Sequence, residues 1–447
     1  MAHIEHDQSQ MITDDYIVTL TKGHPHDIAR QIEHFEAVTI RKIFRGLPDE
    51  LTAEVLAELP LEIQIELFES MRVNRLSGII SEMFTDDAAD VLGSLSTERL
   101  REILTALPKE EASALQSLLN YPEDTAGGIM QREFIAVSDN LTLREAREQI
   151  RKEEESENEG ILYVYVTDMI GRLRGILRIR DLLFRDPNRL VRDVMIKEVR
   201  CVSVHADQEE IAKLVQSYHF LAVPVVDDFG KLVGIVTHDD ILEVIQEEAT
   251  EDIQRLAGLS GEEVIDSSWK ETVAARLPWL FVNLITAFLA ASVVSIFEGT
   301  IAEFALLAVF MPIVAGQGGN SGTQTLTIVV RSLALGEIRL DQRSQLLIKE
   351  LLVGLCNGCA IGISVGFITW LWKGNVLVGV IICLAMIFNM LAAAAAGVMV
   401  PLTLKSLKID PALGSGIMVT TVTDVFGFFI FLGMATVALS IFPGLIF

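Results

Sequence analysis

The sequence predicts a multidomain membrane protein with an α-helical, superhelical N domain, an α+β pair of repeated units and an all-α transmembrane domain of five helices. Three patterns predict this fold class. Apolar residues recur every twelve positions in the first part, Val- and Ile-rich strands then alternate with amphipathic helices, and long apolar segments fill the chain from residue 270. The expected segments are a polar N-terminal segment 1–34, the helical N domain 35–122, the α+β units 123–187 and 188–246, a connecting helix 247–269 and the transmembrane domain 270–447.

Charge is divided unevenly along the chain, whose net charge is −25. From residue 270 onward there are nine Lys or Arg and eight Asp or Glu, which leaves 27 basic and 53 acidic residues in the first 269. A strongly acidic domain repels nucleic acid and attracts cations. The composition therefore argues against a nucleic-acid partner and indicates that divalent cations offset the self-repulsion of the N-terminal part.

The N domain carries a repeat of twelve residues, and Pro directly follows three of its core positions. Because Pro is favoured in the first turn of a helix, each repeat is expected to be one short helix of a small superhelix. Glu54 lies between core positions, and Asp86 and Asp90 share one helix face. Two carboxylates on one face repel unless a cation lies between them; the alternative is a solvated acidic face. The core positions are Leu47, Leu59, Met71, Met83, Leu95, Leu107 and Leu119.

Residues 125–245 contain a second repeat, in which LYVYVTD and AVPVVDD are each followed by a Gly-containing turn and another strand. This pattern resembles a pair of CBS domains, the β-α-β-β-α modules that dimerise and often bind adenosyl nucleotides. The resemblance implies an adenine-nucleotide site, with ATP as a modulator; an empty cleft is the alternative. The residues that match the family's nucleotide positions are Tyr163, Arg180, Asp181 and Phe220.

Five apolar segments follow, at 277–297, 302–330, 346–372, 376–400 and 412–442, each long enough to cross a lipid bilayer. Lys and Arg are concentrated before the first segment, between the second and third, and between the fourth and fifth. Since basic residues favour the cytoplasmic side, this bias places the N-terminal domains in the cytoplasm and the C-terminus outside it. We therefore expect a multi-pass protein of the cytoplasmic (inner) membrane.

The last apolar segment contains one charge, Asp424, between residues 411 and 447. A carboxylate at membrane depth costs ~3 kcal/mol or more, so it usually faces a water-filled path and marks an ion or proton route. Thr420 and Thr421 precede it and add hydroxyls that can hold water. The alternative is an Asp that pairs with a neighbouring helix.

The second apolar segment contains a Pro-, Gly- and amide-rich run from Pro312 to Gln324. Pro frees a backbone carbonyl, and glycines let backbones approach closely or bend away from helical geometry. The neutral oxygens of Asn, Gln, Ser and Thr suit a hard cation or its water shell. A pore lining is the favoured interpretation and helix packing the alternative. The residues of the run that matter are Pro312, Gly316, Gly319, Asn320, Gly322 and Gln324.

This run, together with the order of the domains, resembles the MgtE family of magnesium channels. The resemblance implies a homodimer whose shared pore is formed mainly by the second and fifth spans, with Asp424 recognising Mg²⁺ that keeps most of its waters. It also implies that cytosolic Mg²⁺ binds acidic residues and holds the connecting helix against the pore, which closes it. The matching regulatory positions are Glu54, Asp86, Asp90, Asp240, Glu243, Glu251 and Asp410.

The leading hypothesis is thus a Mg²⁺-selective channel that imports the ion down its electrochemical gradient and closes when cytosolic Mg²⁺ is bound. One alternative is a carrier that exchanges a divalent cation for Na⁺ or H⁺, and another is broader divalent transport that includes Co²⁺ and Mn²⁺. A membrane-anchored nucleotide sensor is a third. An enzyme is not expected, because the eight His show no metal-ligand spacing and no nucleophile–base set or phosphate loop is evident.

Overall fold

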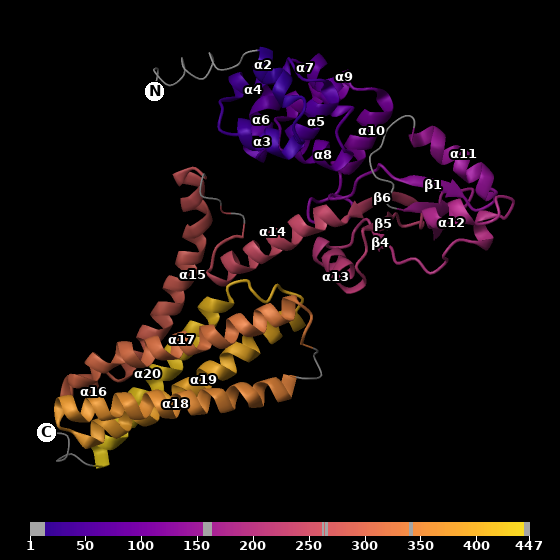
Figure 1. The fold of residues 1–447 in the computed structure, drawn as a ribbon. Coiled ribbons are helices and arrows are strands. Elements are labelled where there is room, and N and C mark those ends of the chain that lie inside the picture. The colour runs from indigo at the N-terminus through magenta and orange to yellow at the C-terminus, as the bar shows by residue number, and fades with distance from the viewer. Residues whose placement is uncertain (1–13, 155–162, 262, 264–266, 339–342, 442–447) are drawn as a thin grey trace. The chain divides into compact units, whose positions relative to one another are not determined.

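The computed structural model describes residues 14–154, 163–261, 263, 267–338 and 343–441. The chain divides into two compact units, Met1–Ile245 and Gln246–Phe447, and each is described by itself. The first unit holds short helices followed by two small sheets, and the second holds long helices (Figure 1). This arrangement confirms the predicted fold class.

Short helices form the first part of unit one, as the twelve-residue repeat predicts. Pro48, Pro60 and Pro108 are the N-cap residues of α5, α6 and α10. Alternate helices pack together, α3 with α5, α5 with α7 and α4 with α6, so the helices form a superhelix around one core. The helices are α2 (Asp14–Leu20), α3 (Pro25–Ile32), α4 (Ala37–Phe44), α5 (Asp49–Ala57), α6 (Leu61–Ser70), α7 (Val73–Ile80), α8 (Thr85–Gly93), α9 (Thr97–Ala106) and α10 (Lys109–Leu118).

The helical domain begins before residue 35, where the sequence pattern predicted its start. Helices α2 and α3 precede that position, and Leu20, Ile28 and Ile32 are buried in the same core as the repeat. The reason is that α3 is amphipathic although its surroundings are polar. The average composition of residues 1–34 is polar, and it does not reveal the short apolar face of α3.

Two β-α-β-β-α units follow, as the CBS resemblance implies. In each three-stranded sheet the first strand pairs parallel with the second, and the second pairs antiparallel with the third. The sheet orders are β1-β2-β3 and β4-β5-β6. The elements are β1 (Ile135–Ser138), α11 (Leu143–Glu154), β2 (Val164–Thr167), β3 (Leu173–Leu177), α12 (Ile179–Phe184), η1 (Val191–Asp193), β4 (Val202–Ser203), α13 (Gln208–Tyr218), β5 (Ala222–Val226) and β6 (Leu232–Thr237).

Helix α14 (His238–Leu256) completes the second CBS unit and continues into the second compact unit. The sequence predicted a separate connecting helix at 247–269, but α14 already ends at Leu256. Gly258 and Gly261 follow with positive φ angles of 79° and 102°, a conformation that ends a helix. The connecting helix is therefore the extension of a CBS helix.

The second unit consists mainly of long helices. Among the residues that the structure describes, four helices, α15, α18, α19 and α20, are long and apolar enough to cross a membrane. Helix α17 has 29 residues and corresponds to the second predicted span, but its polar run lowers its hydropathy. In Figure 1, α17 to α20 run alongside one another, and α19 packs against α17, α18 and α20. The helices are α15 (Trp269–Ile296), α16 (Glu298–Glu303), α17 (Leu306–Ala334), α18 (Arg343–Lys373), α19 (Val376–Ser406) and α20 (Ser415–Ile441).

Candidate ion path and carboxylate cluster

Helix α17 is continuous through Pro312 and the glycine run, so of the two roles considered for the glycines the bend does not occur. Two of the glycines serve the other role, a close approach of neighbouring helices. A Cβ at Gly318 would lie 2.3 Å from Nδ2 of Asn389 on α19, and a Cβ at Gly322 would lie 2.5 Å from Cγ1 of Val419 on α20. Real Cβ atoms do not come so close, so only glycine fits at both positions. This side of α17 faces the helix bundle.

The other side of α17 is uncovered. Pro312, Gly316, Asn320 and Gln324 recur every four residues, lie on one face and are all exposed. Gly319 lies at the border, because a Cβ there would be 3.7 Å from Cγ2 of Thr420. The predicted pore residues thus separate into a packed glycine face and an open polar face.

Asp424 lies in the middle of α20 and is half-buried. Its side chain makes no hydrogen bond or ion pair with any residue that the structure describes. Another carboxylate of the membrane domain differs, because Glu350 on α18 is buried and accepts a hydrogen bond of 3.3 Å from Thr325 Oγ1. The contrast favours an ion path over helix pairing for Asp424.

The two threonines before Asp424 use their hydroxyl hydrogens within α20. Thr420 Oγ1 donates to the Gly416 carbonyl at 2.9 Å, and Thr421 Oγ1 donates to the Ile417 carbonyl at 2.6 Å. Each oxygen keeps lone pairs, so it is available to accept a hydrogen bond from water or to contact a cation. Thr420 lies one turn before Asp424, so its oxygen and the carboxylate share a face of α20.

In the first unit, helix α8 and the start of α14 bring predicted regulatory carboxylates together. Burial, followed by Asp87 and Asp240, raises the pKa of Asp86 well above its usual value. Desolvation, Asp87 and Glu123 raise the pKa of Asp90 to about 7, although its side chain reaches solvent. Asp240 accepts hydrogen bonds from Thr237, but burial still raises its pKa. The cluster carries electrostatic repulsion that a cation would relieve.

Asp87 belongs to this cluster, although the sequence analysis did not select it. Burial raises its pKa to about 7, with further contributions from Asp240, Glu243 and Glu58. Glu58 caps the C-terminus of α5, and the predicted Glu54 lies one turn earlier on that helix, exposed. The adjacent position in the DDAAD run was the available signal. The importance of Asp87 depends on its neighbours on α14, and no local sequence pattern predicts that α14 lies beside α8.

Glu251 and Asp410 do not join the cluster of the first unit. Both lie in the second unit, and Arg255 forms ion pairs with the two of them. Hydrogen bonding to Asp410 and the charge of Glu251 raise the pKa of Arg255 despite the opposing effect of burial. The set of seven regulatory residues therefore divides into two places, and in the second an arginine stands between the carboxylates.

The carboxylate oxygens of this cluster are suitable ligands for a hard divalent cation, but they are not arranged around a common ion position. Carboxylate oxygens are the ligands that Mg²⁺ prefers, and Mg²⁺ usually keeps several waters. Among the residues that the structure describes, no group of three or more His, Cys, Asp or Glu is arranged to hold a metal ion directly. A Mg²⁺ ion bound at this cluster would therefore take several of its ligands from water.

Comparison with known proteins decides the family. The "MgtE intracellular N domain" matches residues 23–124, the CBS domain matches 126–187 and 191–247, and MgtE, described as "Divalent cation transporter", matches 311–434. The chain is 34% identical over 430 residues to the magnesium transporter MgtE of Thermus thermophilus, covering 94% of each chain. The chain belongs to the MgtE family.

Other MgtE proteins agree along nearly the whole length. The magnesium transporter MgtE of Bacillus subtilis is 30% identical over 432 residues, which cover 94% of this chain and 96% of that one. A crystal structure of the soluble part of a magnesium transporter covers 56% of this chain and 97% of its own, at 31% identity and a TM-score of 0.50. The MgtE and CBS resemblances are confirmed, and the chain is a membrane transporter rather than an enzyme.

The residues predicted to bind a nucleotide are not joined to one another by hydrogen bonds, ion pairs or ring contacts in the described part of the CBS pair. Asp181 is only 4% exposed and is held by Arg178 and Arg185; although burial raises its pKa, these hydrogen bonds lower it overall. Tyr163 packs edge-on against Tyr165, and Arg180 is exposed. Among the described residues no hydrogen bond, ion pair or ring contact joins these to Phe220. Nucleotide binding stays a prediction.

Phe220 lies elsewhere in the CBS pair. It stacks on Tyr218 at a ring distance of 5.4 Å, and Arg200 lies over the Tyr218 ring at 5.3 Å. These residues line a pocket of about 510 Å³ with Glu198 and Val199. The pocket offers aromatic faces and one guanidinium group, which are features that a nucleotide uses.

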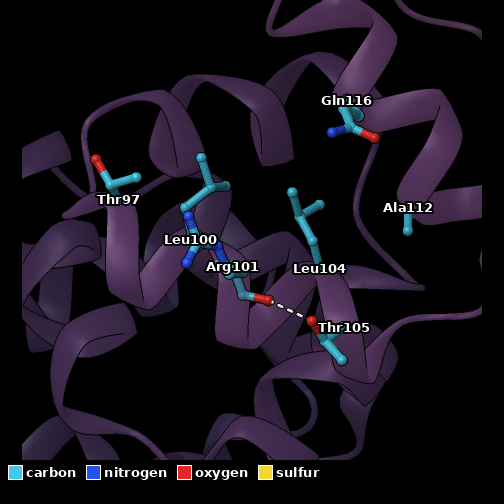
Figure 2. Close-up of a pocket in the computed structure, with 7 residues that line it drawn as sticks. All are labelled: Thr97, Leu100, Arg101, Leu104, Thr105, Ala112 and Gln116. Atoms are coloured by element: carbon cyan, nitrogen blue, oxygen red, sulfur yellow. Dashed lines mark hydrogen bonds between the residues drawn. The ribbon is translucent and has the colours of Figure 1, made fainter.

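A hollow of about 330 Å³ between α9 and α10 has no link to the MgtE ion chemistry. Figure 2 shows Leu100, Leu104 and Ala112 around it, and the backbone oxygen of Arg101 accepting a hydrogen bond of 2.7 Å from Thr105 Oγ1. Its lining contains no carboxylate. It is therefore not a cation site.

Proposed function

We propose that this MgtE protein is a Mg²⁺-selective channel that imports the ion through the cytoplasmic membrane down its electrochemical gradient. One observation carries the proposal. The uncovered polar face of α17 adjoins the turn of α20 that holds Asp424, a carboxylate without a partner among the described residues. The names of the relatives, magnesium transporters, support Mg²⁺ as the transported ion.

A second copy of the chain is the partner that we propose for the open face of α17. Asn320 and Gln324 are exposed in a single protomer, and amide groups facing lipid tails are unfavourable. A homodimer that pairs these faces encloses a polar path with two Asp424 carboxylates near its axis. These carboxylates repel, and a divalent cation that keeps its waters relieves the repulsion.

The orientation follows from the number of spans. Five membrane helices place the two ends of the domain on opposite sides, and the Lys and Arg bias assigns the N-terminal domains to the cytoplasm. The C-terminus is then extracytoplasmic. The membrane potential drives a divalent ion inward in this arrangement, at about 2.3 kcal/mol per charge per 100 mV.

Gating by cytosolic Mg²⁺ is the second part of the proposal. The carboxylates of α8 and α14 repel when no cation is bound, so a divalent ion favours the conformation that holds them together. Helix α14 supplies Asp240 and Glu243 to this cluster. Its last residue, Leu256, packs against the beginning of α20, where a Cβ at Gly416 would lie 2.7 Å from the Leu256 carbonyl oxygen. Ordering α14 therefore restrains the helix that carries Asp424.

The experiment measures Mg²⁺ flux into proteoliposomes at a clamped potential without a Na⁺ or pH gradient. Asp424→Asn should reduce the flux about tenfold or more, because a ring of carboxylates is replaced by neutral amides. Asp228→Asn, in an exposed turn of the CBS pair, is the matched control and should transport like the parent. Equal flux in Asp424→Asn and the parent would remove Asp424 from the path.

A coupled carrier is the competing function. It predicts no flux until a Na⁺ or H⁺ gradient is added, whereas a channel needs only the potential. Adding Co²⁺, Mn²⁺ or Ca²⁺ as competitor to the same vesicles separates Mg²⁺ selectivity from broader divalent transport. Inhibition by Co²⁺ or Mn²⁺ at concentrations equal to that of Mg²⁺ would contradict the hypothesis of a Mg²⁺-selective channel and support broader divalent transport.

A further inference from the structure

Asn389 is a buried amide in the centre of α19, a helix that the proposed path does not include. Between Val376 and Val400 it is the only residue whose side chain carries nitrogen or oxygen. Asn389 is only 1% exposed, and the buried residues next to it on α19 are apolar. A polar group at this depth requires an explanation from its contacts.

The amide lies between two glycines of different helices. Nδ2 donates a hydrogen bond of 2.9 Å to the Val314 carbonyl on α17. A Cβ at Gly318 of α17 would lie 2.3 Å from Nδ2, and a Cβ at Gly427 of α20 would lie 2.7 Å from it. Asn389 therefore fills a space that exists only because both neighbours lack a side chain.

These contacts lie at the height of the proposed path. Val314 precedes the exposed Gly316 by two positions, and Gly427 follows Asp424 by three, less than one helical turn. The Asn389 side chain thus fixes the spacing between the α17 turn that begins the polar face and the α20 turn that carries the carboxylate.

Packing alone does not explain an amide at this place. Oδ1 of Asn389 is buried and has no hydrogen-bond partner among the described residues. An unpaired buried acceptor is unfavourable, whereas Leu has a similar shape and no polar atoms to satisfy. The unpaired amide oxygen therefore lowers the stability of the fold relative to Leu. The feature that Asn has and Leu lacks is the hydrogen bond to the Val314 carbonyl.

We propose that Asn389 is a positioning residue for ion discrimination. It holds α17 and α20 at the spacing at which Asp424 and the polar face accept hydrated Mg²⁺. This inference rests on the proposed function in taking Asp424 as the selecting group. Mg²⁺ demands near-ideal octahedral geometry at short distances, whereas Ca²⁺ accepts longer and more variable ones. A small change in helix spacing therefore affects the two ions differently.

The test compares Asn389→Leu with the parent in proteoliposomes, with Mg²⁺ and Ca²⁺ flux measured separately. Leu has the same branched arrangement of heavy atoms, although its methyl groups are larger, and it removes the hydrogen bond. The Mg²⁺ to Ca²⁺ flux ratio should therefore fall about tenfold while folded protein is retained. Folding is followed by tryptophan fluorescence, because all four Trp lie at or beyond residue 269. An unchanged ratio, or an equal loss of both fluxes, would overturn the inference.

A second variant covers the case in which Asn389→Leu does not fold. Gly427→Ala should destabilise the parent, since the new methyl group meets the amide, whereas Asn389→Ala/Gly427→Ala leaves room for it. The double variant should fold better than Gly427→Ala and show the same fall in the flux ratio. A parental ratio in the double variant contradicts the inference. Asp424→Asn separates the two hypotheses: if it leaves the ratio unchanged, the selecting role of Asp424 fails first.

Discussion

The carboxylate cluster of α8 and α14 predicts an inverted pH dependence. Burial, together with Asp240 and Glu243, raises the pKa of Asp87 to about 7 in the folded protein, from an ordinary value of 3.8. The folded state then binds the proton more tightly than the unfolded state does. The contribution of protonated Asp87 to the stability of the folded state is complete below about pH 4, and it is lost as the pH rises through 7.

The size of the effect follows from this pKa. Between pH 6 and pH 8 a group with a folded pKa of about 7 goes from mostly protonated to mostly ionised, while the unfolded carboxyl stays ionised. Over these two pH units the folded state holds on average about half a proton more than the unfolded state, which corresponds to about 1.4 kcal/mol. Ionisation of Asp87 should therefore increase the local opening of α8 about tenfold between pH 6 and pH 8 when no divalent cation is present, and ionisation of Asp90 adds to this effect.

The assay is amide hydrogen exchange of the full chain in detergent, followed by mass spectrometry of peptides from α8 and α14. Exchange is measured with a chelator at pH 6 and pH 8 and corrected for the intrinsic pH dependence. Asp87→Asn should abolish the part of the loss of protection at pH 8 that comes from Asp87, while the part that comes from Asp90, whose pKa is also about 7, remains. Adding Mg²⁺ at pH 8 should restore protection in the parent and restore less in the variant.

The control is Asp228→Asn, which lies in an exposed turn and should lose protection with pH as the parent does. If Asp87→Asn and the parent lose protection equally between pH 6 and pH 8, the electrostatic argument is refuted. If Mg²⁺ fails to protect α8 and α14 in the parent, the gating proposal loses its sensor even though the pH effect remains.

Two further predictions concern the membrane unit. Gly322→Ala should lower the stability of this unit by about 1–3 kcal/mol, because its methyl group would meet Val419, whereas Gly316→Ala, with open space around it, should not; tryptophan fluorescence during thermal unfolding measures both. Arg255→Gln should increase hydrogen exchange at the end of α14 without Mg²⁺, and Mg²⁺ should reverse this, since the ion can replace the guanidinium between two carboxylates. Arg255→Lys, which keeps the charge, is its control. An increase in exchange that Mg²⁺ does not reverse would contradict the idea that the ion takes the place of the guanidinium group.

The order and type of the domains could be predicted from the sequence. The twelve-residue repeat, the strand pattern of the CBS pair and the long apolar segments are local periodicities, which are visible without any knowledge of tertiary contacts. Asp424 and the run from Pro312 to Gln324 were equally visible, because a charge or a cluster of amides inside an apolar segment differs from its immediate neighbours. The start of the N domain and the end of α14 were less evident, since short amphipathic faces and glycine stops give weak signals.

The tertiary structure alone decided which residues meet. Asp87 gains its importance from Asp240 and Glu243 on a helix about 150 positions later. Arg255 reaches Asp410 across 155 positions, and Asn389 reaches Val314 across 75. Two glycines that looked alike in sequence also differ, because Gly322 faces Val419 whereas Gly316 faces open space. Such contacts depend on how helices pack, and side chains that are distant in sequence acquire their role only when packing brings them within a few ångströms.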